Sequence, residues 1–177
     1  MRRAGFGHFI ICACLLNVAL PPAAADGLLG ATPAPNKAQG DADRPSSLPE
    51  PGSPSAVIKP FYDRYGLELD PTQRDHFIDP ARKVLDGNDA LKKSGQGDCL
   101  DQNMSLDNAV ADRTEIEKTF RMLQSVNGDR AIVVVQFIEA GAPHRLEWKL
   151  AKVGDEWKIS DLLSVTGEWA LSQYQCQ

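Results

Sequence analysis

The chain has 177 residues and a formal net charge of −5 at pH 7, with 42% hydrophobic and 24% charged residues. Its basic residues are dispersed along the sequence, so it lacks the concentrated positive charge of proteins that bind nucleic acid or anionic lipid surfaces. We therefore expect no nucleic-acid partner, and solubility is a sufficient reason for the mild acidity.

The first 25 residues have the pattern of a secretory signal peptide. Arg2 and Arg3 form a basic start, residues 6–20 are mainly apolar, and small residues and prolines follow up to Ala25. We expect cleavage after Ala25, because the apolar stretch is short for a membrane span, and the mature chain then has no span. The pattern predicts a secreted, periplasmic protein. The alternative is lipid attachment at Cys14, although the apolar run continues beyond that cysteine.

Residues 26–54 form a segment rich in Pro, Gly and Ala that shows no apolar periodicity. Such a segment cannot bury enough surface to offset the entropy of ordering it, so we expect a disordered linker. It is either a spacer that holds the domain away from a membrane or partner, or a tolerated disordered terminus. Residues 55–177 are long enough for a single domain with one core.

The first half of this domain has helical patterns. Val57, Ile58, Phe61, Tyr62 and Tyr65 recur at helical spacing and form one apolar, aromatic stripe. Pro60 predicts either a kink in this helix or a helix that starts there, because a proline inside a helix removes a hydrogen bond and clashes with the preceding turn.

Two further helix starts follow. Asp70-Pro71-Thr72-Gln73 combines an N-cap, a proline at the first helical position and a glutamine at the capping-box position. Asp79-Pro80 repeats the signal, so we expect a short helix ending at Ile78 and a second helical piece that carries Val84 and Leu85. The Gly-containing runs at residues 86–89 and 94–97 predict breaks around this piece.

The second half has strand patterns at residues 119–126, 130–138, 145–153 and 157–164, joined by short turn-like connections. Leu146, Trp148 and Leu150 alternate with polar residues, as in an antiparallel sheet with one buried and one solvated face. Residues 132–135 are apolar on both faces, which favours an interior strand. The predicted fold is α+β, with N-terminal helices packed on a four-stranded antiparallel meander.

Signal cleavage leaves two cysteines, Cys99 and Cys176, in a chain sent to an oxidising compartment. We predict a disulfide between them, which would stabilise the domain by about 4 kcal/mol in the chain-entropy model. The alternative is a metal pair, but with only His76 and His144 in the mature chain the usual ligand spacing is missing. We expect no metal and no cofactor.

Four stretches together resemble a known family: Phe61-Tyr62-x-x-Tyr65, Asp98-x-x-Asp101, the run from Gly128 to Val135, and Trp157-Lys158-Ile159-Ser160-Asp161-Leu162. They are similar to a bacterial envelope family of unknown function, periplasmic or lipoprotein, in the nuclear-transport-factor-2-like, cystatin-like cone superfamily. The resemblance covers most of residues 55–171. It implies a curved sheet wrapped around helices, with a pocket between them. It implies no activity, because this scaffold serves isomerases, dehydratases, and binding and assembly modules.

A carboxylate stands out in the last predicted strand, where the two-residue period places Trp157, Ile159, Asp161 and Leu163 on one face. One interpretation is a cofactor-free lyase or isomerase, in which Asp161 is the general base and a tyrosine of the first helix stabilises the oxyanion. The other is structural, because a buried carboxylate usually accepts hydrogen bonds from backbone or side-chain donors. We favour the structural interpretation.

The sequence contains no nucleophile elbow, phosphate-binding loop or dinucleotide fingerprint. His144 follows a proline at a turn, where we expect a solvated strand start rather than a general base, and Asp98 and Asp101 suit loop capping better than a cation site. We predict a non-enzymatic binding domain for a small ligand in the cone or an envelope protein on the sheet. The ligand-binding candidates are Tyr62, Tyr65, Asp98, Asp101, Trp148, Trp157 and Asp161.

Overall fold

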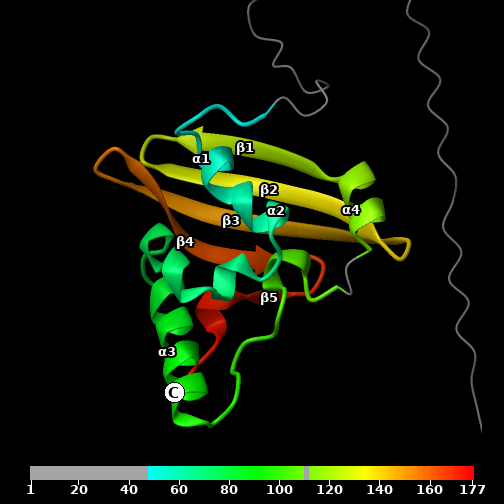
Figure 1. Ribbon diagram of the computed structural model, residues 1–177. Coiled ribbons are helices and arrows are strands. Elements are labelled where there is room, and N and C mark those ends of the chain that lie inside the picture. The colour runs from blue at the N-terminus through cyan, green and yellow to red at the C-terminus, as the bar shows by residue number, and fades with distance from the viewer. Residues whose placement is uncertain (1–47, 110–111) are drawn as a thin grey trace, which may run out of the picture. The chain divides into compact units, whose positions relative to one another are not determined.

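The computed structural model describes residues 48–109 and 112–177, so the predicted signal peptide and most of the predicted linker lie outside the described residues. The described chain forms an α+β domain built on one antiparallel sheet (Figure 1). Its strands lie side by side in sequence order: β1 (Arg121–Asn127), β2 (Arg130–Glu139), β3 (Ala142–Val153), β4 (Glu156–Ser164) and β5 (Trp169–Ala170). The prediction of four strands is wrong, because the two residues of β5 pair with the end of β4 as a fifth strand.

Two short helices precede the sheet, α1 (Pro54–Ile58) and α2 (Pro60–Asp63). The Ser53 side chain caps α1 by accepting a hydrogen bond from the Ala56 amide at 3.2 Å. Lys59 ends the first helix and begins the second, and Pro60 is the first residue of α2. The interruption that Pro60 predicts is therefore confirmed. The two helices bury Ile58, Phe61 and Tyr62 in the core.

A 3-10 helix from Pro71 to His76 starts where the cap signal predicts a helix, because the Asp70 carboxylate accepts a hydrogen bond from the Thr72 amide at 2.9 Å. The next helix, α3 (Ala81–Ser94), runs through residues 86–89, so the break predicted there is wrong. A side chain at Gly87 would collide with the carbonyl oxygen of Cys176. This glycine therefore allows the C-terminal segment to approach the helix closely, and it does not form a turn.

A helix that the sequence patterns did not predict, α4 (Arg113–Thr119), includes Thr119, the first residue of the expected first strand. The Asp112 carboxylate caps it by accepting hydrogen bonds from the amides of Thr114 and Glu115 at 3.0 and 3.2 Å. Strand β1 begins two residues after the helix ends, at Arg121.

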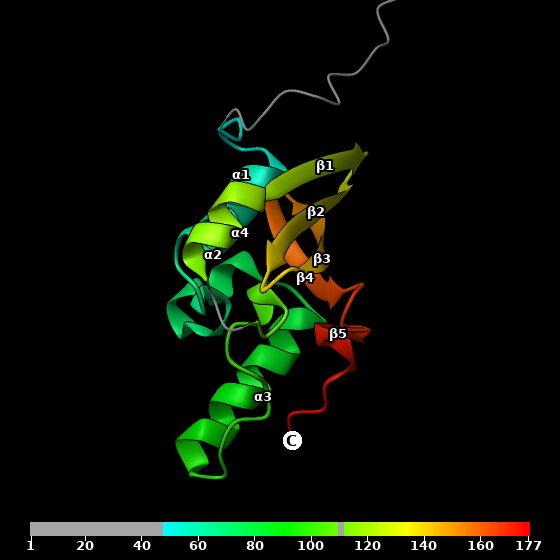
Figure 2. The same cartoon turned by 90° about the vertical axis from the view of Figure 1, so that its right-hand side faces the viewer.

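Helices α1, α2 and α4 lie against one face of the sheet, and the opposite face of β1, β2 and β3 is left uncovered by the described helices (Figure 2). Buried side chains from the covered face of β2 and β3 form the core with the helices; they are Ala131, Val133, Val135, Phe137, Leu146, Trp148 and Leu150. We call the opposite side of β1–β4 the outer face. Helix α3 lies beside β4 and the C-terminal segment.

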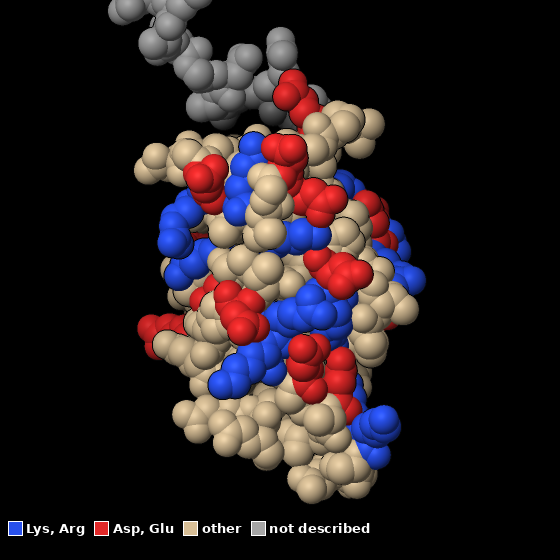
Figure 3. Space-filling model, turned by 90° about the vertical axis from the view of Figure 1, so that its left-hand side faces the viewer, with Lys and Arg blue, Asp and Glu red and all other residues tan. Residues whose placement is uncertain are grey.

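The tight turns β1–β2 and β3–β4 are formed by the short connections that the sequence predicts, and both lie at one end of the sheet (Figure 1). Gly128 and Gly154 have φ values of 57° and 63°, a region that glycine adopts without steric cost. Figure 3 shows this end of the molecule, where basic and acidic side chains are intermixed rather than separated by sign.

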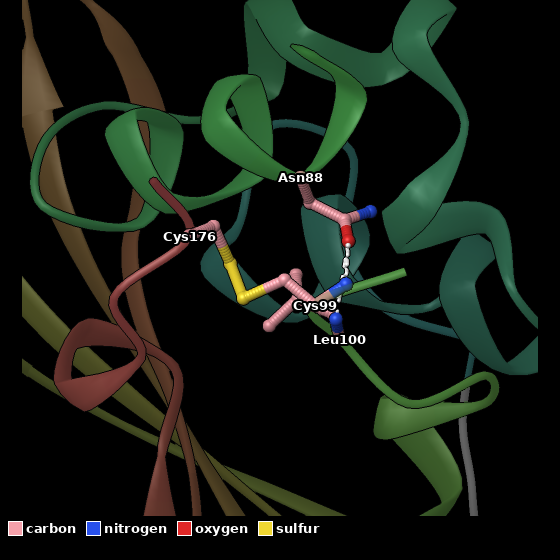
Figure 4. The surroundings of a disulfide bond; sticks show 4 residues. All are labelled: Asn88, Cys99, Leu100 and Cys176. Atoms are coloured by element: carbon pink, nitrogen blue, oxygen red, sulfur yellow. Dashed lines mark hydrogen bonds between the residues drawn. A yellow bond between two sulfur atoms is a disulfide. The ribbon is translucent and has the colours of Figure 1, made fainter. Parts of the chain in front are cut away.

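The C-terminal segment is fixed by the predicted disulfide, which is confirmed: Cys99 and Cys176 are bonded, with their Cα atoms 5.5 Å apart (Figure 4). Asn88 of α3 supports the same region, because its side-chain oxygen accepts hydrogen bonds from the amides of Cys99 at 2.8 Å and Leu100 at 3.1 Å. The disulfide thus ties the loop after α3 to the end of the chain. Within the described residues, no helix has the length and apolar character needed to cross a membrane.

Candidate functional site

The space between the helices and the sheet, where the resemblance implies a pocket, is filled by aromatic side chains. Trp148 is fully buried and its indole Nε1 donates a hydrogen bond to the Tyr62 hydroxyl at 2.9 Å. The ring of Phe61 lies 5.1 Å from that of Trp148, centroid to centroid. Burial raises the pKa of the Tyr62 phenol, so the group stays neutral at physiological pH. These residues are part of the hydrophobic core, and the Trp148 indole N–H has a hydrogen-bond acceptor there.

Tyr65, the other tyrosine of the predicted stripe, is partly buried beside α4. The guanidinium of Arg113 lies over its ring, 5.7 Å from the centroid, as in a cation–π contact. Partial burial raises the pKa of the Tyr65 phenol, and the nearby Arg113 charge opposes this effect.

Asp161 does not continue the face of Ile159, because the pairing of β3 and β4 shifts register and makes Ser160 the extra residue of a β-bulge. Leu162, opposite Trp148, takes the next position on the buried face instead. The single face predicted for residues 157–163 is therefore wrong beyond Ile159. A bulge reverses the alternation that the two-residue period assumes.

The Asp161 carboxylate is nevertheless buried, with 7% of the residue exposed. Its Oδ1 accepts hydrogen bonds from the amides of Ser172 and Leu162 at 3.0 Å, and its Oδ2 accepts one from the Ser172 hydroxyl at 2.8 Å. These bonds attach the C-terminal segment to β4. Such satisfied contacts are those expected of an architectural carboxylate.

The contacts of the other predicted candidates are with residues outside the predicted set. Lys92 forms an ion pair with Asp98 at 3.0 Å, and Asn108 donates to Asp101 at 3.4 Å. Trp157 lies beneath the Lys152 ammonium, 5.8 Å from the centroid of its ring. Within residues 48–109 and 112–177, no group of three His, Cys, Asp or Glu side chains is arranged to hold a metal ion. Of the seven candidates, the structure brings Tyr62 and Trp148 into direct contact.

A buried carboxylate that the sequence did not indicate, Asp107, accepts three side-chain hydrogen bonds: from Nδ1 of His144 at 3.0 Å, from the Thr166 hydroxyl at 2.9 Å and from the Trp169 indole at 2.8 Å. Its side chain is 6% exposed. Burial alone would raise the pKa of Asp107, but the nearby Ser164 hydroxyl and the three hydrogen-bond donors together hold it below its usual value.

The expectation that His144 is a solvated strand start is wrong. Its side chain is 15% exposed, and its ring stacks on Phe137 with centroids 5.0 Å apart. Asp107 lies 37 residues earlier in the chain, so no local spacing could indicate the pair.

The outer face of the sheet carries an apolar stripe, which we define as Leu123, Ile132, Val134 and Ile138. Leu123 pairs directly with Val134 across β1 and β2. Leu123 is 60% exposed, Ile132 40% and Ile138 38%. Strand β2 is thus apolar on both faces, as its sequence predicts, although the described helices cover only one of them.

A groove of about 280 Å³ adjoins this stripe where β1 begins. Arg121, Gln136 and Arg145 line it, and they lie opposite one another on β1, β2 and β3. We call it the arginine groove. Ile138 and Pro143 supply an apolar wall.

A second groove, of about 540 Å³, lies between the start of α3 and the β3–β4 turn. Its charges are neutralised locally: Arg82 lies 3.9 Å from Asp75, and Lys158 lies 2.6 Å from Glu156. This groove therefore has no dominant charge with which to select a ligand.

No protein-family model matches the chain, and no curated protein matches it. Among solved structures, a chain of the type VI native effector–immunity complex Tae3–Tai3 from Ralstonia pickettii matches with 17% identity and a TM-score of 0.44, over 70% of this chain and 99% of that one. A phospholipid-binding protein from Ralstonia solanacearum, solved with a phospholipid, matches with 14% identity and a TM-score of 0.30, over 69% of this chain and 68% of that one. Likenesses this weak carry no conclusion about fold or function.

Proposed function

We propose that this chain is a non-enzymatic binding domain that docks an envelope protein on the outer face of its sheet, through the apolar stripe. The observation that carries the proposal is β2, a central strand with apolar residues on both faces and helices on only one. An antiparallel sheet that faces water normally carries polar residues on its solvated side.

Three residues of the stripe, Leu123, Ile132 and Val134, are contiguous, and Gln136 separates them from Ile138. Leu123 and Val134 are direct cross-strand neighbours, and Ile132 is two residues from Val134 on the same face of β2. Single exposed apolar residues need no explanation, but a contiguous group at the centre of a sheet is typical of a protein interaction surface.

The filled interior favours a protein partner over a small ligand held in a cone. The rings of Phe61, Tyr62 and Trp148 occupy the region between α2 and β3. The alternative of a lyase or isomerase needs a carboxylate free to take a proton, whereas Asp161 already accepts three hydrogen bonds.

The compartment is part of the proposal. The signal-peptide pattern of the first 25 residues predicts export, and a disulfide such as Cys99–Cys176 is typical of an oxidising compartment. The partner would then be a periplasmic or membrane-attached protein.

Site-specific photo-crosslinking in the producing cells tests this proposal. A photoreactive residue is placed at Ile132 or Leu123 on the outer face, and at Lys93, exposed on α3, as the control. We expect one protein to be captured from both outer-face positions and not from Lys93. The purified partner should bind the wild-type chain and lose at least about tenfold in affinity for Ile132→Asp, about 1.4 kcal/mol. Equal capture from all three positions, or none, would contradict the proposal.

A further inference from the structure

We propose that the arginine groove binds carboxylates presented by an acidic segment of the docked protein. The identity of the partner rests on the proposed function, but the affinity of the groove for carboxylates does not. The groove thus gives the outer face a chemical preference beyond its apolar stripe.

The geometry of the groove suits a carboxylate. Arg121 and Arg145 flank Gln136 on three adjacent strands. Neighbouring strands are about 4.8 Å apart, so the two arginine backbones are separated by roughly 10 Å. Two long guanidinium side chains can close over an anion between them, and the Gln136 amide adds neutral donors. Arg–carboxylate contacts of this kind are often bidentate, which gives them both strength and direction.

Both guanidinium groups keep donors for a ligand. Arg121 Nη1 donates to the Phe120 carbonyl at 2.8 Å, and Arg145 Nη2 contacts the Glu147 carboxylate at 3.1 Å. A guanidinium has five N–H donors, so within the described part of the chain these contacts leave most N–H donors of each arginine without an acceptor. The Arg145 side chain is 44% exposed and therefore accessible.

The outer face has a positive net charge, whereas the formal net charge of the whole chain is −5. By strand register, its basic residues are Arg121, Arg130, Arg145, Lys149 and Lys158, and its acidic residues are Glu147, Glu156 and the buried Asp161. Five basic residues therefore oppose three acidic ones on this face. Interfaces are typically complementary in charge, which favours an acidic partner.

The arginine groove and the apolar stripe are close enough for one segment of a partner protein to contact both. The row of Arg121 and Gln136 lies two residues along the strands from the row of Leu123 and Val134, about 7 Å away. A partner segment that places an apolar side chain on the stripe would bring a neighbouring Asp or Glu to the groove.

NMR titration of the ¹⁵N-labelled chain tests this inference. The probes are glutarate, the blocked tripeptide acetyl-Glu-Val-Glu-amide, its Gln-Val-Gln counterpart and inorganic phosphate. We expect saturable shift changes at the amides of Arg121, Gln136 and Arg145 with the Glu peptide and, more weakly, with glutarate. The Arg121→Gln, Arg145→Gln double variant should bind at least tenfold more weakly, whereas Lys93→Gln, exposed on α3, should retain binding.

The outcomes separate the alternatives. Saturation by glutarate alone would overturn the assignment to a protein segment, and tighter binding of phosphate than of either carboxylate would overturn the ligand class. Absence of saturable shifts, or unchanged binding in the double variant with its fold intact, would overturn the inference entirely. Crosslinks from Ile132 without carboxylate binding would refute only this inference, and the reverse result would refute only the proposed function.

Discussion

Gly87→Ala should reverse the usual effect of replacing a helical glycine. In an exposed helix interior, alanine is more stable than glycine by about 1 kcal/mol. In α3, however, the added methyl group would collide with the Cys176 carbonyl oxygen and lie 3.1 Å from its Cβ. Overpacking of this kind costs about 1–3 kcal/mol, so the two effects together predict a net loss of about 1 kcal/mol.

The assay is equilibrium unfolding in guanidinium chloride under oxidising conditions. The control background is a chain that ends at Gln173 and carries Cys99→Ser, so that the segment facing Gly87 is absent. There, Gly87→Ala should stabilise the fold by roughly 0.5–1 kcal/mol. The same sign of change in both backgrounds would refute the reasoning, because the contact with Cys176 would then not determine the effect.

Three further predictions concern buried polar groups and the disulfide. Asp161→Leu should lower the free energy of unfolding by about 1–3 kcal/mol, because the Ser172 donors lose their acceptor; unchanged or increased stability would instead indicate a carboxylate kept for chemistry. Glu68 is buried, and its Oε1 accepts a hydrogen bond from the Ser105 amide at 3.0 Å. Burial raises the pKa of this carboxyl, so between the ordinary pKa and the raised one the native chain holds a proton that the unfolded chain has lost, and stability should fall as pH rises through that range. Glu68→Gln should flatten that part of a melting-temperature profile against pH, and an unaltered slope would contradict this. Replacing both Cys99 and Cys176 with serine opens a loop with a sequence separation of 77 and should remove about 4 kcal/mol, whereas an identical denaturation midpoint would show that the disulfide does not stabilise the fold.

Local signals predicted the elements whose structure depends on local chemistry. The Asp70 cap, the interruption at Pro60 and the glycine turns at Gly128 and Gly154 each lie where their residue types require a particular backbone conformation. The alternation of apolar residues around Trp148 likewise identified the buried face of β3 correctly.

The errors arose where tertiary contacts overrode local preference. The sequence around Gly87 predicts a helix break, but the glycine lies within α3, where the close approach of Cys176 leaves no room for a side chain. The bulge at Ser160 moved Asp161 off the predicted face, because one extra residue reverses the alternation. The first strand begins at Arg121 rather than at residue 119, because the Asp112 cap starts a helix that runs to Thr119.

The candidate site was less predictable than the fold, because its residues meet only through strand pairing. Arg121, Gln136 and Arg145 are ordinary solvated positions in the sequence and become neighbours only in the registered sheet. Asp107 and His144 meet in the same way, across 37 residues. Sequence alone did reveal that β2 is apolar on both faces, which is the feature on which the proposed function rests.

The most direct test of the account is the affinity of the crosslinked partner, measured by isothermal titration calorimetry, for Ile132→Asp and Val126→Asp. Val126 is 50% exposed on the same strand pair but on the opposite face, so it is a matched control. We expect at least about a tenfold loss of affinity for Ile132→Asp and an unchanged affinity for Val126→Asp. Undiminished binding by Ile132→Asp would contradict docking on the outer face.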